Sequence, residues 1–263
     1  MKTDEFWAFA WERERIREKQ EMGLNPPFSD DPRLRDYWFP NLRRMDDPTT
    51  VWLHGALLGP LTEPPEIVLA TVAFRLFGSQ EAGEAMLPMF LGPGYHEAGL
   101  LAAVGPLKAP FNGHLSRHLR SGTLAAAAAT CEAIEASDGL WHLLRGASLR
   151  EAVRALRAVP GIGPELAYEI VCDLRWTPVL QDAPDKLSWA LPSRSAVEAV
   201  GSLQERELRS TRRLDRQETV AAMRALLEES QFDDWELSEV QRTLSLFHFW
   251  SRKAQPPRRY RWR

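Results

Sequence analysis

A short turn near residue 160 constrains the fold of this chain more than any other segment. It reads Val159-Pro160-Gly161-Ile162-Gly163-Pro164. An amphipathic segment precedes it, Leu149 to Ala158, and another follows it, Glu165 to Leu174. Glycine adopts left-handed backbone dihedrals without strain, and proline suits the first turn of a helix. The pattern therefore predicts two helices joined by a tight glycine turn over residues 149–174, a helix-hairpin-helix.

The predicted hairpin also has the chemistry of a phosphate site. Because glycine has no side chain, the amide groups of this turn and the start of the next helix can face an anion. We therefore expect Pro160, Gly161, Ile162 and Gly163 to contact the backbone of DNA. Backbone carbonyls in the same turn can hold a monovalent cation, and we expect no other cofactor. The alternative is a purely structural connection between two helices.

The rest of the chain is ordinary in composition and helical in pattern. Its 263 residues are 44% hydrophobic and 26% charged, as in a typical globular protein, and strand patterns are scarce. We predict an all-α protein with one helical domain at 1–250, which can divide into two lobes, and a basic tail at 251–263. No apolar stretch reaches the roughly 20 residues that cross a membrane, and the N-terminus lacks the apolar core of a signal peptide. The expected location is the cytoplasm.

Charge and cysteine content exclude several classes of protein. A formal net charge of -3 argues against a non-specific nucleic-acid coat. The tail is nevertheless basic, and Arg258 and Arg259 are expected to contact DNA, unless the tail is only a solvated end. The two cysteines indicate neither a disulfide framework nor a zinc site. His114 and His118 have a metal-compatible spacing, but no third ligand is apparent, so no metal site is predicted.

Asp185 is a candidate catalytic residue. It follows the hairpin at the distance where helix-hairpin-helix DNA glycosylases carry their catalytic aspartate, and such a carboxylate can stabilise positive charge on a flipped nucleoside. The resemblance implies a glycosylase-like helical fold. It is incomplete in chemistry, because the hairpin holds no lysine nucleophile and the chain has no cysteine cluster for an iron–sulfur centre.

The N-terminal region concentrates charges between aromatic residues. Glu12 to Arg17 is rich in both signs of charge, and Phe39 to Trp52 contains Asn41, an Arg-Arg pair and an Asp-Asp pair at a predicted turn. Such a grouping suits phosphates and base edges. Farther on, Ile67 to Phe77 is an apolar helix with one charge, Arg75, which must reach a carboxylate, a carbonyl or a ligand phosphate if buried.

The Phe39–Trp52 block, the hairpin and the segment Glu169–Pro178 together resemble a phage DNA-modification family. This family is the alpha-glutamyl/putrescinyl thymine pyrophosphorylases, understood as amino acid:DNA transferases, and it is similar to the helical domain of the 5-hydroxymethyluracil DNA kinases. The resemblance covers roughly residues 6–260. No Walker loop ending in Gly-Lys-Ser/Thr occurs, so kinase activity itself is not expected.

The resemblance implies a DNA-modifying transferase in a bacterium or a phage-infected cell. Its substrate is a pyrophosphorylated 5-hydroxymethyluracil in DNA, flipped from the duplex. The enzyme expels pyrophosphate and joins an amine, either an amino acid or a polyamine, to the thymine methyl carbon.

The residue types required by this reaction are present. Arginines must neutralise the leaving pyrophosphate, a carboxylate must deprotonate the amine, and an amide can read the uracil edge. The candidate arginines are Arg15, Arg43, Arg44 and Arg75; the candidate bases are Asp46, Glu12 and Asp185; and the candidate amide is Asn41.

The chain also departs from the family pattern. Leu191–Val197 replaces a Gly-Pro-Gly stretch, and Leu246–Phe249 replaces an acidic run. His248 can take over as a base at neutral pH, although a histidine on an aromatic helix is more often a core residue. Two alternatives follow: a glycosylase-like base-excision enzyme that uses Asp185, and a non-catalytic DNA-binding homologue.

Overall fold

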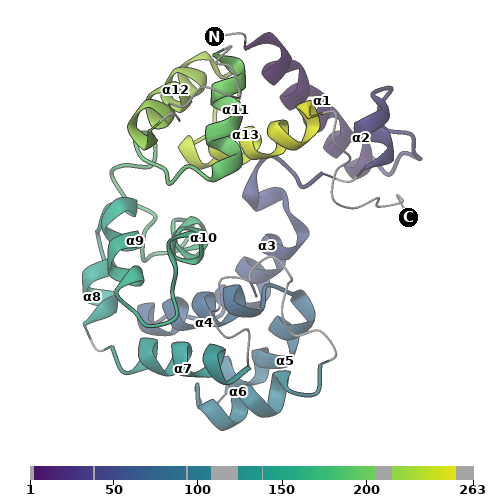
Figure 1. Cartoon of the computed structure of the whole chain (residues 1–263). Helices are drawn as coiled ribbons and strands as arrows, with labels where there is room; N and C mark the ends of the chain where they lie inside the picture. The colour runs from purple at the N-terminus through teal and green to yellow at the C-terminus, as the bar shows by residue number, and fades with distance from the viewer. Residues whose placement is uncertain are drawn as a thin grey trace. The chain divides into compact units, whose positions relative to one another are not determined.

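The computed structural model describes residues 3–37, 39–92, 94–107, 124–137, 139–204 and 215–252. Every regular element among them is a helix, which confirms the predicted all-α class (Figure 1). The chain divides into two compact units: unit 1 is Met1–Asp47 with Leu187–Arg263, and unit 2 is Pro48–Lys186. His114, His118, Arg258 and Arg259 lie outside the described residues. Among the described helices, none combines the length and the apolar character that a membrane span requires.

Unit 1 is built around its C-terminal helix. Helix α13 packs against α11, α12 and α1, and the Phe247 ring lies 5.6 Å from the Phe6 ring and 5.9 Å from the Phe9 ring of α1. Leu237, Val240, Leu244 and Phe247 are spaced by three and four residues and form the buried apolar stripe of α13. The helices of this unit are α1 (Asp4–Glu21), α2 (Pro32–Asp36), a 3₁₀ turn (Arg44–Asp46), α11 (Arg194–Leu203), α12 (Arg216–Glu229) and α13 (Leu237–Ser251).

Unit 2 is built around α4 (Pro64–Phe77), which packs against α5, α7 and α10. From Ile67 to Phe77 every residue except Arg75 is buried, as expected for a helix with so little polar character. The other helices of this unit are α3 (Pro48–Trp52), a π-helical turn (Leu53–Leu58), α5 (Gln80–Phe90), α6 (Glu97–Val104), α7 (Leu124–Glu135), α8 (Leu140–Leu144), α9 (Leu149–Arg157) and α10 (Pro164–Leu174).

Helices α9 and α10 are the pair predicted from the glycine turn. Ser148 and Glu151 form a capping box at the start of α9, and α10 begins at Pro164 directly after Gly163. Between the helices, Gly161 has a φ of +90°, and the Ile162 amide donates to the Val159 carbonyl at 3.2 Å. Each of these features follows from local sequence chemistry, a Ser-x-x-Glu start and a glycine turn.

Candidate functional site

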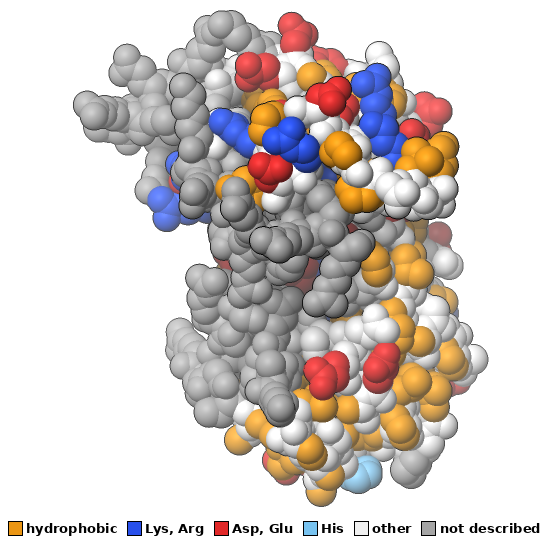
Figure 2. Space-filling view, turned by 90° about the vertical axis from the view of Figure 1, so that its right-hand side faces the viewer, with side chains coloured by type: hydrophobic (Ala, Val, Ile, Leu, Met, Phe, Trp, Pro, Cys, Tyr) orange, Lys and Arg blue, Asp and Glu red, His pale blue; other side chains and the backbone are white. Residues whose placement is uncertain are grey.

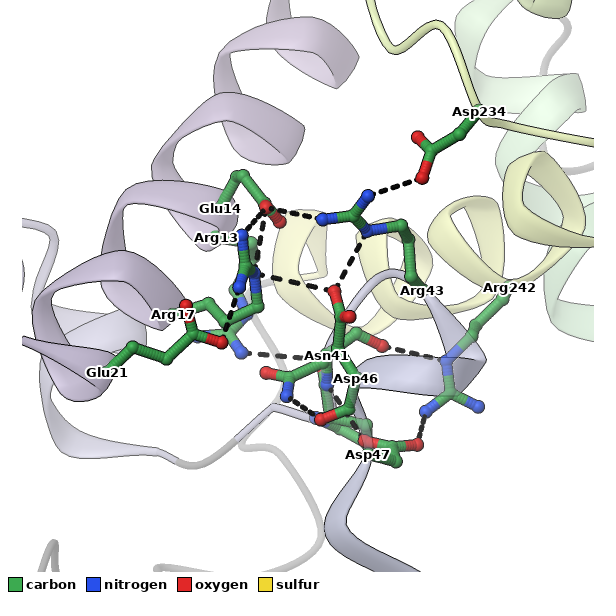
Figure 3. A network of polar contacts seen from close by, with 11 residues as sticks. Arg13, Glu14, Arg17, Glu21, Asn41, Arg43, Asp46, Asp47, Asp234 and Arg242 are labelled. Carbon is green, nitrogen blue, oxygen red and sulfur yellow. Dashed lines mark hydrogen bonds and ion pairs between the residues drawn. The ribbon is translucent and has the colours of Figure 1, made fainter. Parts of the chain in front are cut away.

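Arg43 lies at the centre of a network of charged side chains in unit 1 (Figure 3). Its Nε donates to Asp46 Oδ2 at 2.9 Å, its Nη2 lies 3.4 Å from Glu14 Oε1, and its Nη1 donates to Asp234. One guanidinium thus joins three carboxylates from α1, the 3₁₀ turn and the loop before α13. Burial acts to lower the pKa of Arg43, but the hydrogen bonds to Asp234 and Asp46 outweigh it and the pKa lies above its usual value.

Arg17 extends this network along α1. It donates to Glu14 at 2.8 Å through Nε and to Glu21 through Nη1, and its Nε lies 3.4 Å from Asp46 Oδ2. The hydrogen bond to Glu14 is the main reason that the pKa of Arg17 is raised. Glu14, Arg17 and Glu21 share one face of the helix because they are three and four residues apart.

The turn from Asn41 to Asp47 is held from its other side by α13. Arg242 donates to the Asn41 carbonyl at 2.8 Å and also pairs with Asp47. The side-chain amide of Asn41 donates to the Asp46 carbonyl at 2.7 Å, and its backbone amide donates to Asp47 at 3.2 Å. The Asn41 side chain therefore closes its own turn.

Arg13 fixes the start of the same segment from the interior. Its side chain is buried, and its Nη2 donates to the Phe39 carbonyl at 2.7 Å and to the Pro40 carbonyl at 3.3 Å. Among the residues that the structure describes, its Nε and Nη1 atoms have no hydrogen-bond partner. Burial lowers the pKa of Arg13 to about 10. Burying a cation is costly in free energy. The two hydrogen bonds of Arg13 offset part of this cost and fix residues 39–40 against α1.

The positive and negative charges of this network nearly balance. Three arginines (Arg17, Arg43 and Arg242) pair with five carboxylates (Glu14, Glu21, Asp46, Asp47 and Asp234), and the buried Arg13 adds a fourth positive charge. On the face drawn in Figure 2, too, the Lys and Arg side chains lie among Asp and Glu side chains. An anion that binds Arg43 must compete with its carboxylates, and Asp234, whose side chain is 60% exposed, is the one that solvent reaches best.

Of the residues predicted for the site, Asn41, Arg43 and Asp46 come together in this network. Glu12 and Arg15 lie on another side of α1: Arg15 is 67% exposed and 3.7 Å from Glu12, which accepts a hydrogen bond from Ser29 at 2.6 Å. Position 15 is displaced from positions 14 and 17 around the helix, because successive residues turn by about 100°. Arg44 is buried.

Arg75 and Asp185 belong to unit 2. Of the partners open to Arg75, the structure shows a carboxylate: Nη2 donates to Asp173 Oδ1 at 2.8 Å, and Nε donates to the other oxygen. The Asp173 side chain is fully buried. Asp185 accepts the amide of Leu149 at 2.6 Å and that of Arg150 at 3.1 Å, one on each oxygen. It therefore satisfies backbone donors that every helix start leaves unpaired.

Sequence reasoning missed several members of the network, namely Glu14, Arg17, Asp234 and Arg242. The Glu14-Arg17-Glu21 spacing was the available signal for α1, since such positions pair on a helix. No local signal identifies Asp234 or Arg242, because Arg43 and Asp234 are separated by 191 residues.

Residues 2–89 match the family model for the helical domain of 5-hmdU DNA kinase. The matched stretch contains the α1 and Asn41–Asp47 parts of the network, and also Arg75. Neither the curated proteins nor the solved structures gave a match to this chain. Over residues 2–89, the chain is therefore similar to the helical domain of a 5-hmdU DNA kinase.

Proposed function

We propose that this protein is a DNA-modifying transferase that acts on pyrophosphorylated 5-hydroxymethyluracil. It displaces pyrophosphate and attaches an amine, an amino acid or a polyamine, to the thymine methyl carbon. The observation that carries the proposal is the match of residues 2–89 to the helical domain of a kinase named for 5-hmdU DNA. The sequence lacks a Walker loop, so a different step in hypermodification of thymine is assigned to this chain.

The reaction makes two demands on the protein. The bond between the methyl carbon and the pyrophosphoryl oxygen breaks, and its electron pair leaves with pyrophosphate. The amine nitrogen forms the new bond to carbon and gives up a proton. Cationic donors must therefore neutralise the leaving group, and a base must take the proton.

The contacts in unit 1 support different roles for its arginines. Arg15 is 67% exposed and only loosely paired, at 3.7 Å from Glu12, so it is assigned to the leaving pyrophosphate. Arg43 is bound by three carboxylates, and we assign it to positioning Asp46. Its neighbour in the chain, Arg44, is buried. The proton acceptor is assigned to a carboxylate of this region, either Glu12 or Asp46.

The glycine turn supports DNA as the polymer. Gly163 is the N-cap residue of α10, and within the described part of the chain its position provides no side-chain cap for this helix. Pro160 and Gly161 are exposed, whereas Ile162 is buried and anchors the turn. Uncapped amides at a helix start are suited to one phosphate group.

The test is a product analysis. The protein is incubated with duplex DNA that carries 5-hydroxymethyluracil pyrophosphate, together with a mixture of amino acids and putrescine, and the nucleosides are then digested and weighed. We expect a nucleoside with a new amine and an equal amount of released pyrophosphate. DNA with plain 5-hydroxymethyluracil is the control and should give no adduct. Abasic sites or unchanged nucleosides from the activated DNA would contradict the transferase.

A second candidate function, base excision, is favoured by the placement of Asp185. Its carboxylate is fixed by two backbone amides at the start of α9, in the same unit as the glycine turn. A carboxylate held in this way can stabilise a cationic sugar. Abasic sites that form with wild-type protein and disappear in Asp185→Asn would support this candidate over the transferase.

A further inference from the structure

Helix α9 carries three arginines along its exposed side. Arg150, Arg154 and Arg157 are exposed and spaced by four and three residues, so they lie on one face of the helix. The opposite face is buried and packs against the rest of unit 2; it consists of Leu149, Ala152, Val153 and Leu156. We call Arg150, Arg154 and Arg157 the α9 arginine stripe.

The stripe differs from the network arginines of unit 1 in its electrostatic surroundings. Arg17, Arg43 and Arg242 all form ion pairs with carboxylates. Across the described parts of the chain, no ion pair joins a stripe guanidinium to a carboxylate. Exposed cations that the protein itself does not neutralise are the groups that attract an anionic polymer.

Glu151 is the acidic residue beside the stripe on α9, and it is engaged elsewhere. Its carboxylate accepts the Ser148 amide at 3.0 Å and the Ser148 hydroxyl at 2.8 Å. The hydrogen bond from the Ser148 backbone is the main reason that the pKa of Glu151 is lowered, and the charge of Arg154 contributes less. The carboxylate is thus held at the helix start, where it interacts favourably with the helix dipole.

We propose that the α9 arginine stripe binds consecutive phosphates along one strand of DNA. The proposal rests on the proposed function only in taking DNA as the polymer. Seven residues of α-helix rise about 10 Å, which equals the axial rise of about three nucleotide steps in a duplex. Arginine suits this task because its planar guanidinium binds phosphate through two donors at once.

The two ends of the stripe lie next to the glycine turn and next to Asp185. Arg157 is the last residue of α9, directly before the turn that contains Gly161. At the other end, the backbone amide of Arg150 donates to Asp185 at 3.1 Å. A strand that follows the stripe therefore runs from the glycine turn to Asp185, both within unit 2.

The test measures the salt dependence of binding to an unmodified duplex. Binding constants are obtained by fluorescence anisotropy over a range of salt concentrations for wild type and for the triple variant Arg150→Gln, Arg154→Gln, Arg157→Gln. Each lost phosphate contact lowers the slope of log K against log salt by about 0.9. We expect the triple variant to lose about 2.7 from the slope, and the corresponding triple lysine variant to keep it.

A matched control removes the same charge from unit 1. The triple variant Arg35→Gln, Arg194→Gln, Arg252→Gln changes three exposed arginines that are each paired with a carboxylate and should leave the slope unchanged. Thermal unfolding and helical circular dichroism of both variants verify that they fold. A slope that is unchanged in the stripe variant, or reduced equally in the control, overturns the proposal. So does a wild-type protein that binds polyglutamate as tightly as DNA, or one that binds no DNA.

The binding assay involves no chemistry, so it separates this proposal from the proposed function. A reduced slope in the stripe variant, without any amine adduct in the product analysis, supports DNA binding by the stripe and contradicts the transferase. An adduct together with an unchanged slope contradicts only the proposal about the stripe.

Discussion

Gly161 and Thr130 lie so close that a Cβ atom on Gly161 would be 2.1 Å from the Thr130 hydroxyl oxygen. Gly161 also has a φ of +90°, a conformation that residues with side chains rarely adopt. Two independent constraints, one from its own backbone and one from α7, therefore require glycine here. Gly163 has neither constraint: its φ is −81°, and a Cβ atom added there would meet no other described residue within 4 Å beyond its chain neighbours.

We therefore expect Gly161→Ala to destabilise the protein and Gly163→Ala to be tolerated. The backbone strain alone costs about 1–3 kcal/mol, and the clash with Thr130 adds to it. Thr130→Ala in the Gly161→Ala background should recover part of the loss, since it removes the clash but not the strain. Urea unfolding of the single and double variants measures these effects. Equal stability of the two glycine variants would contradict this account.

The glycine turn and the charge network show what a sequence can and cannot predict. The turn, its two helices and the apolar stripe of α13 follow from spacings within about four residues, and the structure has them. For Arg75 the sequence required a partner, but it could not single out Asp173, which is 98 residues away. The network around Arg43 depends on Asp234 and Arg242, whose proximity is a product of tertiary packing rather than of local pattern.

Arg75 and Asp173 supply the second prediction. Arg75→Ala leaves the fully buried carboxylate of Asp173 without this cation, and breaking a buried pair in this way costs about 3–5 kcal/mol. Arg194→Ala is the control, because its pair with Glu198 has an arginine that is 80% exposed and should contribute less than about 1 kcal/mol. Chemical unfolding compares the two. Similar small losses in both would show that the Arg75–Asp173 pair is not important for stability.

Substitution of Arg43 should mainly lower stability, whereas substitution of Arg15 should mainly weaken the binding of pyrophosphate. Arg43→Ala leaves Glu14, Asp46 and Asp234 without their shared cation, so we expect a loss of about 1–3 kcal/mol. Arg15→Ala alters an exposed side chain and should change stability by less than about 0.5 kcal/mol. It should weaken inhibition of the transferase by added pyrophosphate at least tenfold. Pyrophosphate inhibition that is unchanged in Arg15→Ala would transfer the leaving-group contact to another arginine.

The Glu198–His248 pair predicts how stability depends on pH. His248 Nε2 lies 3.1 Å from Glu198 Oε2. Burial, followed by the charge of Arg252, lowers the pKa of His248 despite this carboxylate. The unfolded chain therefore takes up a proton at a higher pH than the folded protein does. Stability should be complete above about pH 6.5 and fall as the pH decreases below it.

The pKa of Glu198 is also lowered, because its pairs with Arg194, His248 and Arg252 outweigh its burial. A carboxylate of this kind loses its contribution only at lower pH, below about 4.5. Between about pH 6.5 and pH 5, the urea midpoint of His248→Gln should consequently fall less than that of wild type. His142→Gln, which changes an exposed histidine, should follow wild type. A parallel fall in all three proteins would show that the pKa of His248 is the same in the folded and unfolded states.

Asp185 provides a test in which a structural and a chemical role give different results. Both of its oxygens accept amides at the start of α9, so Asp185→Ala should lose about 1 kcal/mol, as for other helix caps. Asp185→Asn retains one acceptor oxygen and should lose less. If Asp185 only caps α9, Asp185→Asn modifies DNA at the wild-type rate, as measured by the formation of adducts or abasic sites. If Asp185 stabilises charge on the nucleoside, the same variant shows the same small loss of stability but its reaction is slowed at least a hundredfold. Comparing the rates of the Asn and Ala variants with their urea midpoints therefore separates the two roles, because only a chemical role makes the rate fall without a matching fall in stability.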